Sequence, residues 1–289
     1  MGYSFARHET FHIRTGWLRK GLNALKENEH IFLEEDAMEE LGIGKNMVSS
    51  LRYWLQATGL TKEEYNSRRQ KIQKKTDLAK KILKYDKYFE DPATFWILHY
   101  NIVKNESKLA TTWHWFFNYF NYIKFDQELF IDQLKKFIRR TGEKMPAESS
   151  LKKDFNVFTR MYLYDSDDNR SPESSLESPF TDLKLLYKSE DNKYKINNPG
   201  SDNLPSDILF YCLLDSIENN NLSINIDHAL NNINSVGNIF KLTPTIFYNY
   251  LNELEEKEYL RVDKQAGLDS ITILEDSKEN VLKSYYKNN

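Results

Sequence analysis

Near its start the chain reads His8-Glu9-Thr10-Phe11-His12, which matches the H-E-x-x-H pattern of zinc metalloproteases. On a helix this spacing places the two imidazoles on one face, where they hold zinc, and the glutamate between them acts as the general base. The local sequence does not favour that helix, because Thr10 and Phe11 are indifferent helix formers. A zinc protease site at His8 and His12 is therefore only a hypothesis, and such a site also requires a third zinc ligand.

A third zinc ligand is not evident downstream. Leu18 stands where the extended metzincin pattern requires histidine, and Gly16 falls one place late. Glu27 or Glu35 could serve as the downstream acid of other zinc proteases, but we expect no zinc at this site. The alternatives are local hydrogen bonding or surface packing, and a polar site that His8 and Glu9 share with Arg14 and Lys20.

A helix-turn-helix pattern positions a second set of polar side chains. A short apolar helix around Ala37, Met38 and Leu41 is followed by a Gly-Ile-Gly turn and a second helix that buries Val48 and Leu51. The opposite face of the second helix repeats polar residues at helical steps and suits contact with phosphates and base edges. We predict a DNA-binding surface made of Lys45, Asn46, Ser49, Arg52, Tyr53 and Gln56, with Arg14 and Lys20 nearby.

Charge is distributed unevenly. Residues 1–164 carry 28 Lys and Arg against 21 Asp and Glu, whereas residues 165–289 carry 12 against 22. A basic run from Lys62 to Lys84 directly follows the helix-turn-helix pattern and could extend a contact along a phosphate backbone. The alternatives are an ordinary uneven surface and a solvated polar helix face.

Aromatic-rich helices follow in the centre of the chain, and they contain His99 and His114. A histidine in such company is usually a core residue. Glu90 and Asp91 could bind a divalent metal, but Asp91 directly before Pro92 is typical of a helix cap.

The last third predicts a winged helix. An apolar helix begins near Pro205, and a second begins with Thr243 as N-cap and Pro244 at its first position. Strand, turn at Gly267 and strand then complete the order. The predicted fold is mainly α, with helix-turn-helix or winged-helix units and a small C-terminal hairpin. Four regions are expected: 1–84 (helix-turn-helix, DNA-binding), 85–164 (central, aromatic-rich and helical), 165–180 (linker or loop) and 181–289 (winged-helix-like).

Composition limits the function classes. A lone Cys212 excludes an internal disulfide framework and, with no signal-peptide pattern and no long apolar stretch, predicts a cytoplasmic protein without a membrane span. The sequence has no P-loop, Rossmann glycine pattern, CxxC or GxSxG motif.

Longer blocks carry a resemblance. They are HETFHIRTGWLRKG, LGIGKNMVSSLRYWLQATGL, EDPATFWILHYNIV, ATTWHWFFNYF and ESPFTDLKLL. In this order, from His8 to about Leu274, they resemble the bacterial domain-of-unknown-function family number four thousand and seven, whose members are similar to the nickase-like B component of Ssp-type DNA phosphorothioation systems. The family block usually has another residue at His12, which makes the H-E-x-x-H match incidental, and the resemblance gives weight to Lys45, Asn46 and Met47.

The resemblance implies DNA binding in a phosphorothioation or phage-defence system, with a cysteine desulfurase and a phosphoadenylylsulfate-reductase-like protein as partners. In a nicking version, Mg²⁺ or Mn²⁺ would lie near Glu9 or Asp91, with His8 or a neighbouring histidine as the base. The alternative is a non-catalytic DNA-binding adaptor or regulator that recruits partner enzymes. A homo-oligomer is left open.

Overall fold

Three helices form the beginning of the chain in the computed structural model: α1 (Trp17–Glu27), α2 (Ala37–Leu41) and α3 (Lys45–Ala57), with a 3-10 turn, η1 (Ile31–Leu33), before α2. The apolar residues Trp17, Leu18, Leu22 and Leu25 recur at helical spacing along α1, and all four are buried. The predicted short face of α2 is buried at Ala37 and Leu41, but Met38 is exposed. Gly42 adopts a left-handed conformation (φ 60°) that ends α2 and allows the sharp turn into α3.

The described residues are 2–105, 108–164, 177–217, 222–264, 269–275 and 277–288. Their contacts group the chain into two units, residues 1–196 (unit 1) and residues 197–289 (unit 2). The four predicted regions stay a prediction. Most of the predicted linker, residues 165–176, lies outside the described residues, while residues 181–196 belong with unit 1.

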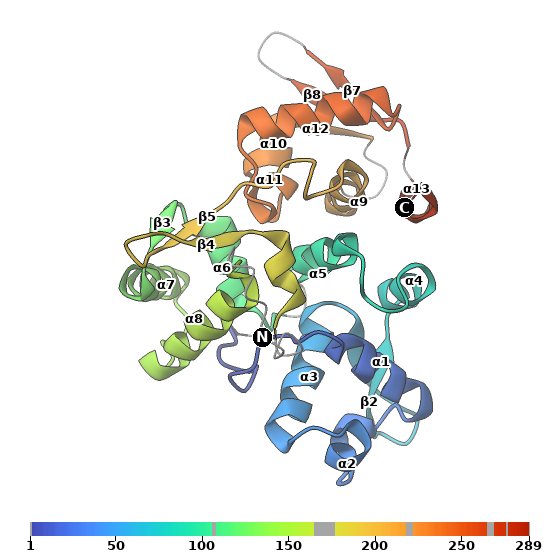
Figure 1. The fold of residues 1–289 in the computed structure, drawn as a ribbon, viewed down its shortest axis with the longest axis vertical. Coiled ribbons are helices and arrows are strands. Elements are labelled where there is room, and N and C mark those ends of the chain that lie inside the picture. The colour runs from blue at the N-terminus through green and yellow to red at the C-terminus, as the bar shows by residue number, and fades with distance from the viewer. Residues whose placement is uncertain are drawn as a thin grey trace. The chain divides into compact units, whose positions relative to one another are not determined.

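A β-hairpin follows α3 where the sequence showed only a charged run. Strands β1 (Thr61–Tyr65) and β2 (Lys71–Lys75) pair antiparallel, with Glu63 opposite Gln73. The hairpin lies beside the first three helices, and α4 (Asp77–Tyr85) follows it (Figure 1). Ile72 and Gln73 of β2 are buried, while most of the other side chains of the two strands are only partly buried or exposed.

The aromatic core of unit 1 lies among four helices: α5 (Pro92–Lys104), α6 (Thr111–Tyr119), α7 (Gln127–Thr141) and α8 (Glu148–Tyr162). The Phe130 ring of α7 packs against Trp115 and Phe116 of α6, with centroid distances of 5.0 and 5.7 Å. His99 is fully buried, and its Nδ1 lies 2.8 Å from the Tyr162 hydroxyl, which confirms it as a core residue.

A three-stranded sheet closes unit 1 and joins segments that are distant in sequence. It consists of β3 (Lys124–Phe125), β4 (Leu186–Lys188) and β5 (Tyr194–Ile196), in the antiparallel order β3-β5-β4. Before it comes a 3-10 helix, η3 (Pro179–Leu183), whose Phe180 is fully buried. The sequence did not predict this sheet.

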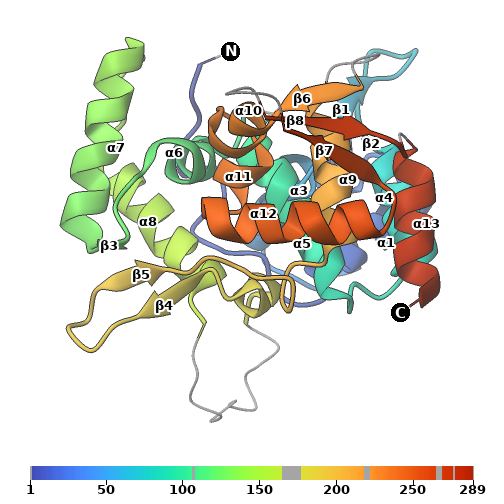
Figure 2. The same cartoon turned by 90° about the horizontal axis from the view of Figure 1, so that it is seen from above.

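Unit 2 alternates helices with short strands: α9 (Ser206–Ser216), β6 (Ser223–Asn225), α10 (Ile226–Asn231), α11 (Val236–Ile239), α12 (Pro244–Glu256), β7 (Leu260–Asp263), β8 (Ser270–Ile273) and α13 (Lys278–Asn288). The predicted hairpin is present as β7 and β8, and β6 joins it as a third strand in the order β6-β8-β7, with α12 beside β7 (Figure 2).

Helix α12 begins as the sequence predicted. The Thr243 hydroxyl accepts the backbone N–H of Ile246 and caps the helix, with Pro244 at its first position. Its predicted buried face, which includes Phe247 and Leu254, is at most 1% exposed. The described elements of both units are mostly helices, and this confirms mainly α as the fold class. None of the described helices is long and apolar enough to cross a membrane.

Candidate functional site

The first two turns of α3 present exposed polar side chains. Gly44 begins the helix in an extended conformation, and Lys45, Asn46 and Ser49 follow on its exposed side. Val48 and Leu51, on the other side, are 6% and 0% exposed and fix the helix against the core. In the N-terminal half of α3, the polar residues that the sequence predicted to bind DNA are therefore available to a ligand. We call the whole predicted set along α3 the polar row.

The C-terminal half of the predicted row contacts the hairpin. The Arg52 guanidinium donates to the Glu63 carboxylate of β1 through Nε, at 2.7 Å, and through Nη2. Gln56 Nε2 donates to the same oxygen at 3.2 Å, and Lys71 Nζ lies 2.9 Å from the second Glu63 oxygen. Arg52 and Gln56 thus connect α3 to β1.

Glu63→Gln is expected to lower the free energy of unfolding by about 1 kcal/mol at neutral pH. Burial alone would raise the pKa of Glu63, but hydrogen bonds from Lys71 and Arg52 outweigh it and lower that pKa below its usual value. A carboxyl whose folded-state pKa is lowered stabilises the fold above its unfolded pKa and loses that contribution as the pH falls through the folded value.

Urea unfolding of wild type and Glu63→Gln at neutral and acidic pH measures this effect. The difference between the two proteins should shrink in acid. Glu64→Gln on the same strand is the control, because the Glu64 carboxylate pairs with Lys62 and Lys74 at the surface and should contribute less. An equal loss for Glu63→Gln at both pH values would contradict the assignment.

Tyr53 lies in the core instead of on the polar row. Its side chain is 7% exposed, and its hydroxyl donates to the Leu109 carbonyl at 3.1 Å. Burial, followed by the nearby Asp154 carboxylate, raises the pKa of Tyr53 well above its usual value. The ring packs edge-on against Trp54 at 4.8 Å, so Tyr53 helps to orient α3 from inside.

Arg14 and Lys20 lie on separate local structures. The Arg14 guanidinium is 5.4 Å from the Phe11 ring and 5.2 Å from the Trp17 ring, and its Nε is buried without a hydrogen-bond partner among the described residues. Lys20 Nζ donates to the Leu41 carbonyl at 2.9 Å, at the carboxyl end of α2, where a cation is favourable. Within the described part of the chain, no hydrogen bond joins these two side chains.

His8 belongs to a buried polar cluster. It is fully buried, its Nδ1 accepts the Thr10 backbone N–H at 3.2 Å, and its Nε2 therefore donates to Asp154 Oδ1 at 2.9 Å. Asp154 of α8 also accepts the Ala6 backbone N–H at 2.7 Å and the Thr112 hydroxyl. The cluster attaches the N-terminal segment to α6 and α8.

The H-E-x-x-H segment is a turn and not a helix, which removes the zinc-protease geometry. Glu9 and Thr10 have φ values of 49° and 69°, in the left-handed region, and the Glu9 side chain is exposed. Asp91 caps α5 by accepting the Ala93 backbone N–H at 2.8 Å, as the capping alternative predicted. Across the described ranges no three His, Cys, Asp or Glu side chains gather to hold a metal.

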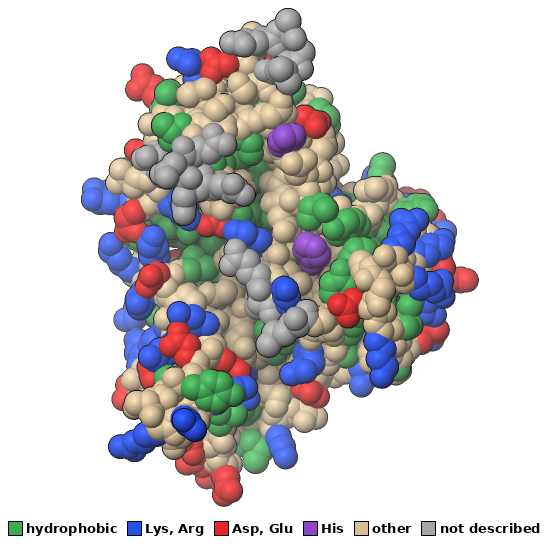
Figure 3. Space-filling model, turned by 180° about the vertical axis from the view of Figure 1, so that it is seen from behind, with side chains coloured by type: hydrophobic (Ala, Val, Ile, Leu, Met, Phe, Trp, Pro, Cys, Tyr) green, Lys and Arg blue, Asp and Glu red, His purple; other side chains and the backbone are tan. Residues whose placement is uncertain are grey.

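Further cations lie on the hairpin and α4. Arg68 and Arg69 occupy the exposed hairpin turn, where Asn66 accepts the Arg68 backbone N–H at 2.9 Å. Lys62 and Lys74 pair with Glu64 at 2.7 and 3.6 Å. Figure 3 shows Lys and Arg side chains gathered over α4 and over α7, both in unit 1. Several cations of the basic run, among them Lys62, Lys71 and Lys74, are thus paired with carboxylates, while the turn is exposed.

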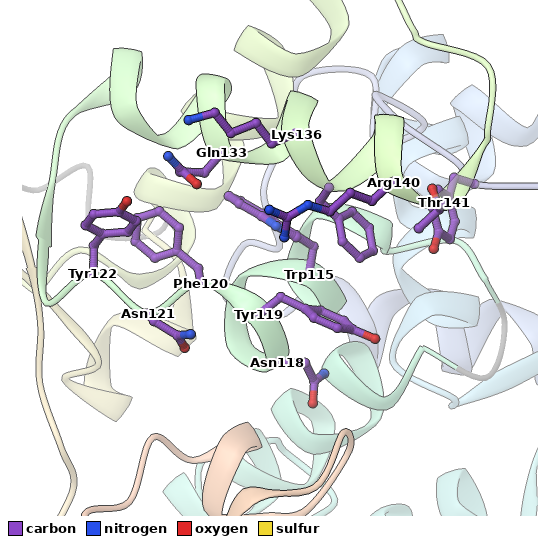
Figure 4. A pocket seen from close by; sticks show the side chains of 12 residues that line it. Trp115, Asn118, Tyr119, Phe120, Asn121, Tyr122, Gln133, Lys136, Arg140 and Thr141 are labelled. Carbon is purple, nitrogen blue, oxygen red and sulfur yellow. The ribbon is translucent and has the colours of Figure 1, made fainter.

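Unit 1 also contains a pocket of about 450 Å³ that the sequence analysis missed. Aromatic, amide and cationic side chains from the N-terminal segment, α6, the segment after it and α7 surround it (Figure 4). The signal available in the sequence was QLKKFIRR, which places Gln133, Lys136 and Arg140 along one side of α7. The lining residues are Tyr3, Trp115, Asn118, Tyr119, Phe120, Asn121, Tyr122, Gln133, Lys136, Phe137, Arg140 and Thr141.

Comparisons with known proteins give one family and two similar structures. A family model described as "Protein of unknown function (DUF4007)" matches residues 5–286. The crystal structure of magnesium ion-bound SspB is 28% identical, with a TM-score of 0.87, over 99% of this chain and 88% of that chain. A second SspB crystal structure is 27% identical, with a TM-score of 0.86 and the same coverage. A search of curated proteins found no match.

Proposed function

This chain belongs to the DUF4007 family, and from that premise we propose that it is an SspB-like, DNA-binding component of a bacterial DNA phosphorothioation and phage-defence system. The likeness to SspB over 99% of the chain supports the assignment to such a system. The single observation that carries DNA binding is the exposed polar start of α3, with Lys45, Asn46 and Ser49 directly after a Gly-containing turn.

We also propose that each unit contains a winged helix. In unit 1, α1, α2 and α3 are followed by the β1–β2 hairpin, which corresponds to three helices and a wing. In unit 2, the order α9, β6, α10, α11, α12, β7, β8 corresponds to the same arrangement with an additional strand and the short helix α11. Among the described residues, only the winged helix of unit 1 exposes cations both on its second helix-turn-helix helix, α3, and on its wing, the β1–β2 hairpin. We therefore assign DNA binding to unit 1.

In this proposal α3 enters the major groove by its amino-terminal turns. Asn46 can make a bidentate contact with an adenine edge, while Lys45 and Ser49 contact phosphate or base edges. The hairpin turn brings Arg68 and Arg69 to the backbone beside the groove. Arg52 and Gln56 hold the hairpin against α3 by way of Glu63, and so act as positioning residues for the wing.

Lys45→Ala and Asn46→Ala are expected to weaken duplex binding in different ways. Loss of one phosphate contact at Lys45 should lower the slope of log affinity against log salt by about 0.9. Loss of a base contact at Asn46 should cost roughly 1–3 kcal/mol and relax sequence preference at one position, with little change in slope. Fluorescence anisotropy with a labelled duplex at several salt concentrations measures both effects.

Lys153→Ala is the matched control for charge, because Lys153 is exposed on α8, away from α3 in the chain. Its duplex affinity and salt slope should equal those of wild type. If all three variants bind alike, α3 is not the DNA surface, and the DNA-binding proposal fails.

Between the two versions of this function, the non-catalytic adaptor is favoured by the state of the three predicted catalytic residues. His8 is buried with its Nε2 bonded to Asp154, and Asp91 caps α5. Magnesium is present in the SspB structure, and the described residues of this chain bring no three His, Cys, Asp or Glu side chains together. We therefore assign magnesium neither residues nor a reaction step.

The adaptor version is that DNA binding recruits the sulfur-transfer enzymes, a cysteine desulfurase and a phosphoadenylylsulfate-reductase-like protein. Supercoiled plasmid incubated with the purified protein and Mg²⁺ or Mn²⁺ distinguishes it from a nickase. The adaptor leaves the plasmid supercoiled. Metal-dependent nicking that is lost in Glu9→Gln would instead support the predicted catalytic site, since Glu9 is exposed and its replacement does not disturb the core.

A further inference from the structure

The pocket of unit 1 has a floor of aromatic rings. Tyr3 stacks on Phe137 with centroids 5.5 Å apart and an interplanar angle of 20°, and the Tyr119 ring lies 4.9 Å from the same Phe137 ring, centroid to centroid. Tyr122 packs against Phe120 at 5.4 Å. Tyr3, Tyr119 and Phe137 thus form one group of rings in the lining, and Phe120 and Tyr122 form a second.

Several of these rings remain accessible to solvent. Tyr3, Tyr119 and Tyr122 are 36%, 39% and 46% exposed. The Tyr119 hydroxyl can donate a hydrogen bond, and burial together with the neighbouring Tyr3 raises the pKa of this group. The pocket therefore offers flat, partly exposed rings with hydroxyl groups at their edges, which is the kind of surface on which a planar ligand stacks.

One wall of the pocket is cationic. Lys136 and Arg140 lie one helical turn apart on α7 and face the rings of α6 and of the segment after it (Figure 4). Arg140 is exposed, and within the described part of the chain its guanidinium has no ion pair or hydrogen bond. Lys136 pairs with Asp132 at 2.8 Å, but both side chains are about half exposed, so an anion can compete for the ammonium group.

The polar groups between the rings and the cations are neutral. Asn121 is exposed. Gln133 lies at the edge of the pocket, and its Nε2 donates a hydrogen bond of 3.3 Å to the Asp132 carboxylate. None of the lining residues is acidic. Amide groups can pair with both donors and acceptors on a base edge, whereas a carboxylate lining would repel phosphate.

We propose that this pocket binds a nucleotide whose base is unpaired. The phosphate lies on Lys136 and Arg140, the base stacks on Tyr122 or Tyr119, and Asn121 or Gln133 contacts the base edge. The volume of about 450 Å³ is within the range of small-ligand pockets and suits one nucleotide. Two sources share this chemistry, a nucleotide within single-stranded DNA and a free mononucleotide.

This binding is separate from the duplex surface proposed on α3, and the two can fail independently. The pocket requires an unstacked base, because its rings replace the stacking partners of that base. A protein that holds duplex through α3 and an unpaired nucleotide here would hold DNA at a locally opened site.

The test uses the full chain, a labelled single-stranded oligonucleotide and the mononucleotide dAMP. Arg140→Ala should weaken oligonucleotide binding and lower its log-log salt slope by about 0.7. Arg139→Ala is the matched control, because it removes the same charge from the same turn of α7. Arg139 is exposed, as Arg140 is, but it does not line the pocket. It should bind as wild type.

Tyr122 tests stacking apart from charge. Tyr122→Ala should lower affinity for the oligonucleotide by roughly 5- to 100-fold with an unchanged salt slope, and Tyr122→Phe should retain most of the affinity. The Tyr122 and Arg140 side chains are both solvent-accessible, so thermal melting should show that the variants remain folded.

The two probes distinguish the source of the nucleotide. If dAMP binds and loses affinity in Arg140→Ala, the occupant is a free nucleotide; if only the oligonucleotide does so, it is single-stranded DNA. Lys45→Ala should leave single-strand affinity unchanged, which separates this result from failure of the α3 surface. If neither probe binds, or if Arg140→Ala and Arg139→Ala bind with equal affinity, the proposal is overturned.

Discussion

Asp154→Ala is expected to lower the free energy of unfolding by about 3–5 kcal/mol. The Asp154 side chain is 2% exposed and accepts from the Ala6 N–H, His8 Nε2 and the Thr112 hydroxyl. Alanine leaves three donors in the interior without an acceptor, and a buried donor without a partner costs its full desolvation energy. Chemical denaturation followed by circular dichroism measures the loss.

Two variants separate this mechanism from a general sensitivity of α8. Lys153→Ala changes the exposed neighbour and should remain within about 0.5 kcal/mol of wild type. Asp154→Asn keeps one carbonyl oxygen as an acceptor and should lose less than Asp154→Ala. A loss below about 1 kcal/mol for Asp154→Ala would mean that the donors find other partners, and that the cluster does not attach the N-terminal segment.

Trp54→Ala is expected to cost about 3–5 kcal/mol of stability, the range for removal of a large buried aromatic side chain. Trp54 is fully buried on α3, packs edge-on against Trp113 with centroids 5.3 Å apart, and lies parallel to the His8 ring at 6.1 Å. Its Nε1 donates to the Phe11 carbonyl at 2.9 Å. The substitution removes the packing that fixes the orientation of α3, and near-UV circular dichroism should fall with stability.

Trp54→Phe is the control that keeps an aromatic ring. It loses the Nε1 hydrogen bond, but Ser50 also donates to the Phe11 carbonyl, at 3.4 Å, so this oxygen retains a partner. We expect a loss of roughly 1–3 kcal/mol, smaller than that of Trp54→Ala. Equal losses would show that the hydrogen bond, and not the ring volume, determines the contribution of Trp54.

Much of the helical structure could be predicted from local sequence. Apolar residues at helical spacing gave α1 and α3, and the Thr243-Pro244 pair gave the start of α12. These features depend on side chains within one or two turns of each other. The β1–β2 hairpin was missed because its strands are mostly polar, and their apolar contact is confined to Ile72 and its neighbour.

Functional residues were harder to predict because their roles depend on distant partners. The sequence placed Arg52 and Tyr53 beside each other on a helix that follows a turn, and that helix is present. Only the tertiary structure showed that Arg52 meets Glu63 of β1 and that Tyr53 is buried against Leu109. A helical period specifies a side chain's angle around its own axis, but not what packs against that angle.

The H-E-x-x-H segment shows the same division. Its sequence supplied two imidazoles and a carboxylate at metal-binding spacing, and its poor helix formers already argued against a zinc helix. The long-range contact of His8 with Asp154, 146 residues away, fixed it as a buried structural group. The pocket between α6 and α7 likewise exists only after the chain brings Tyr3 to Phe137, because a cavity is a property of packed elements and not of any one of them.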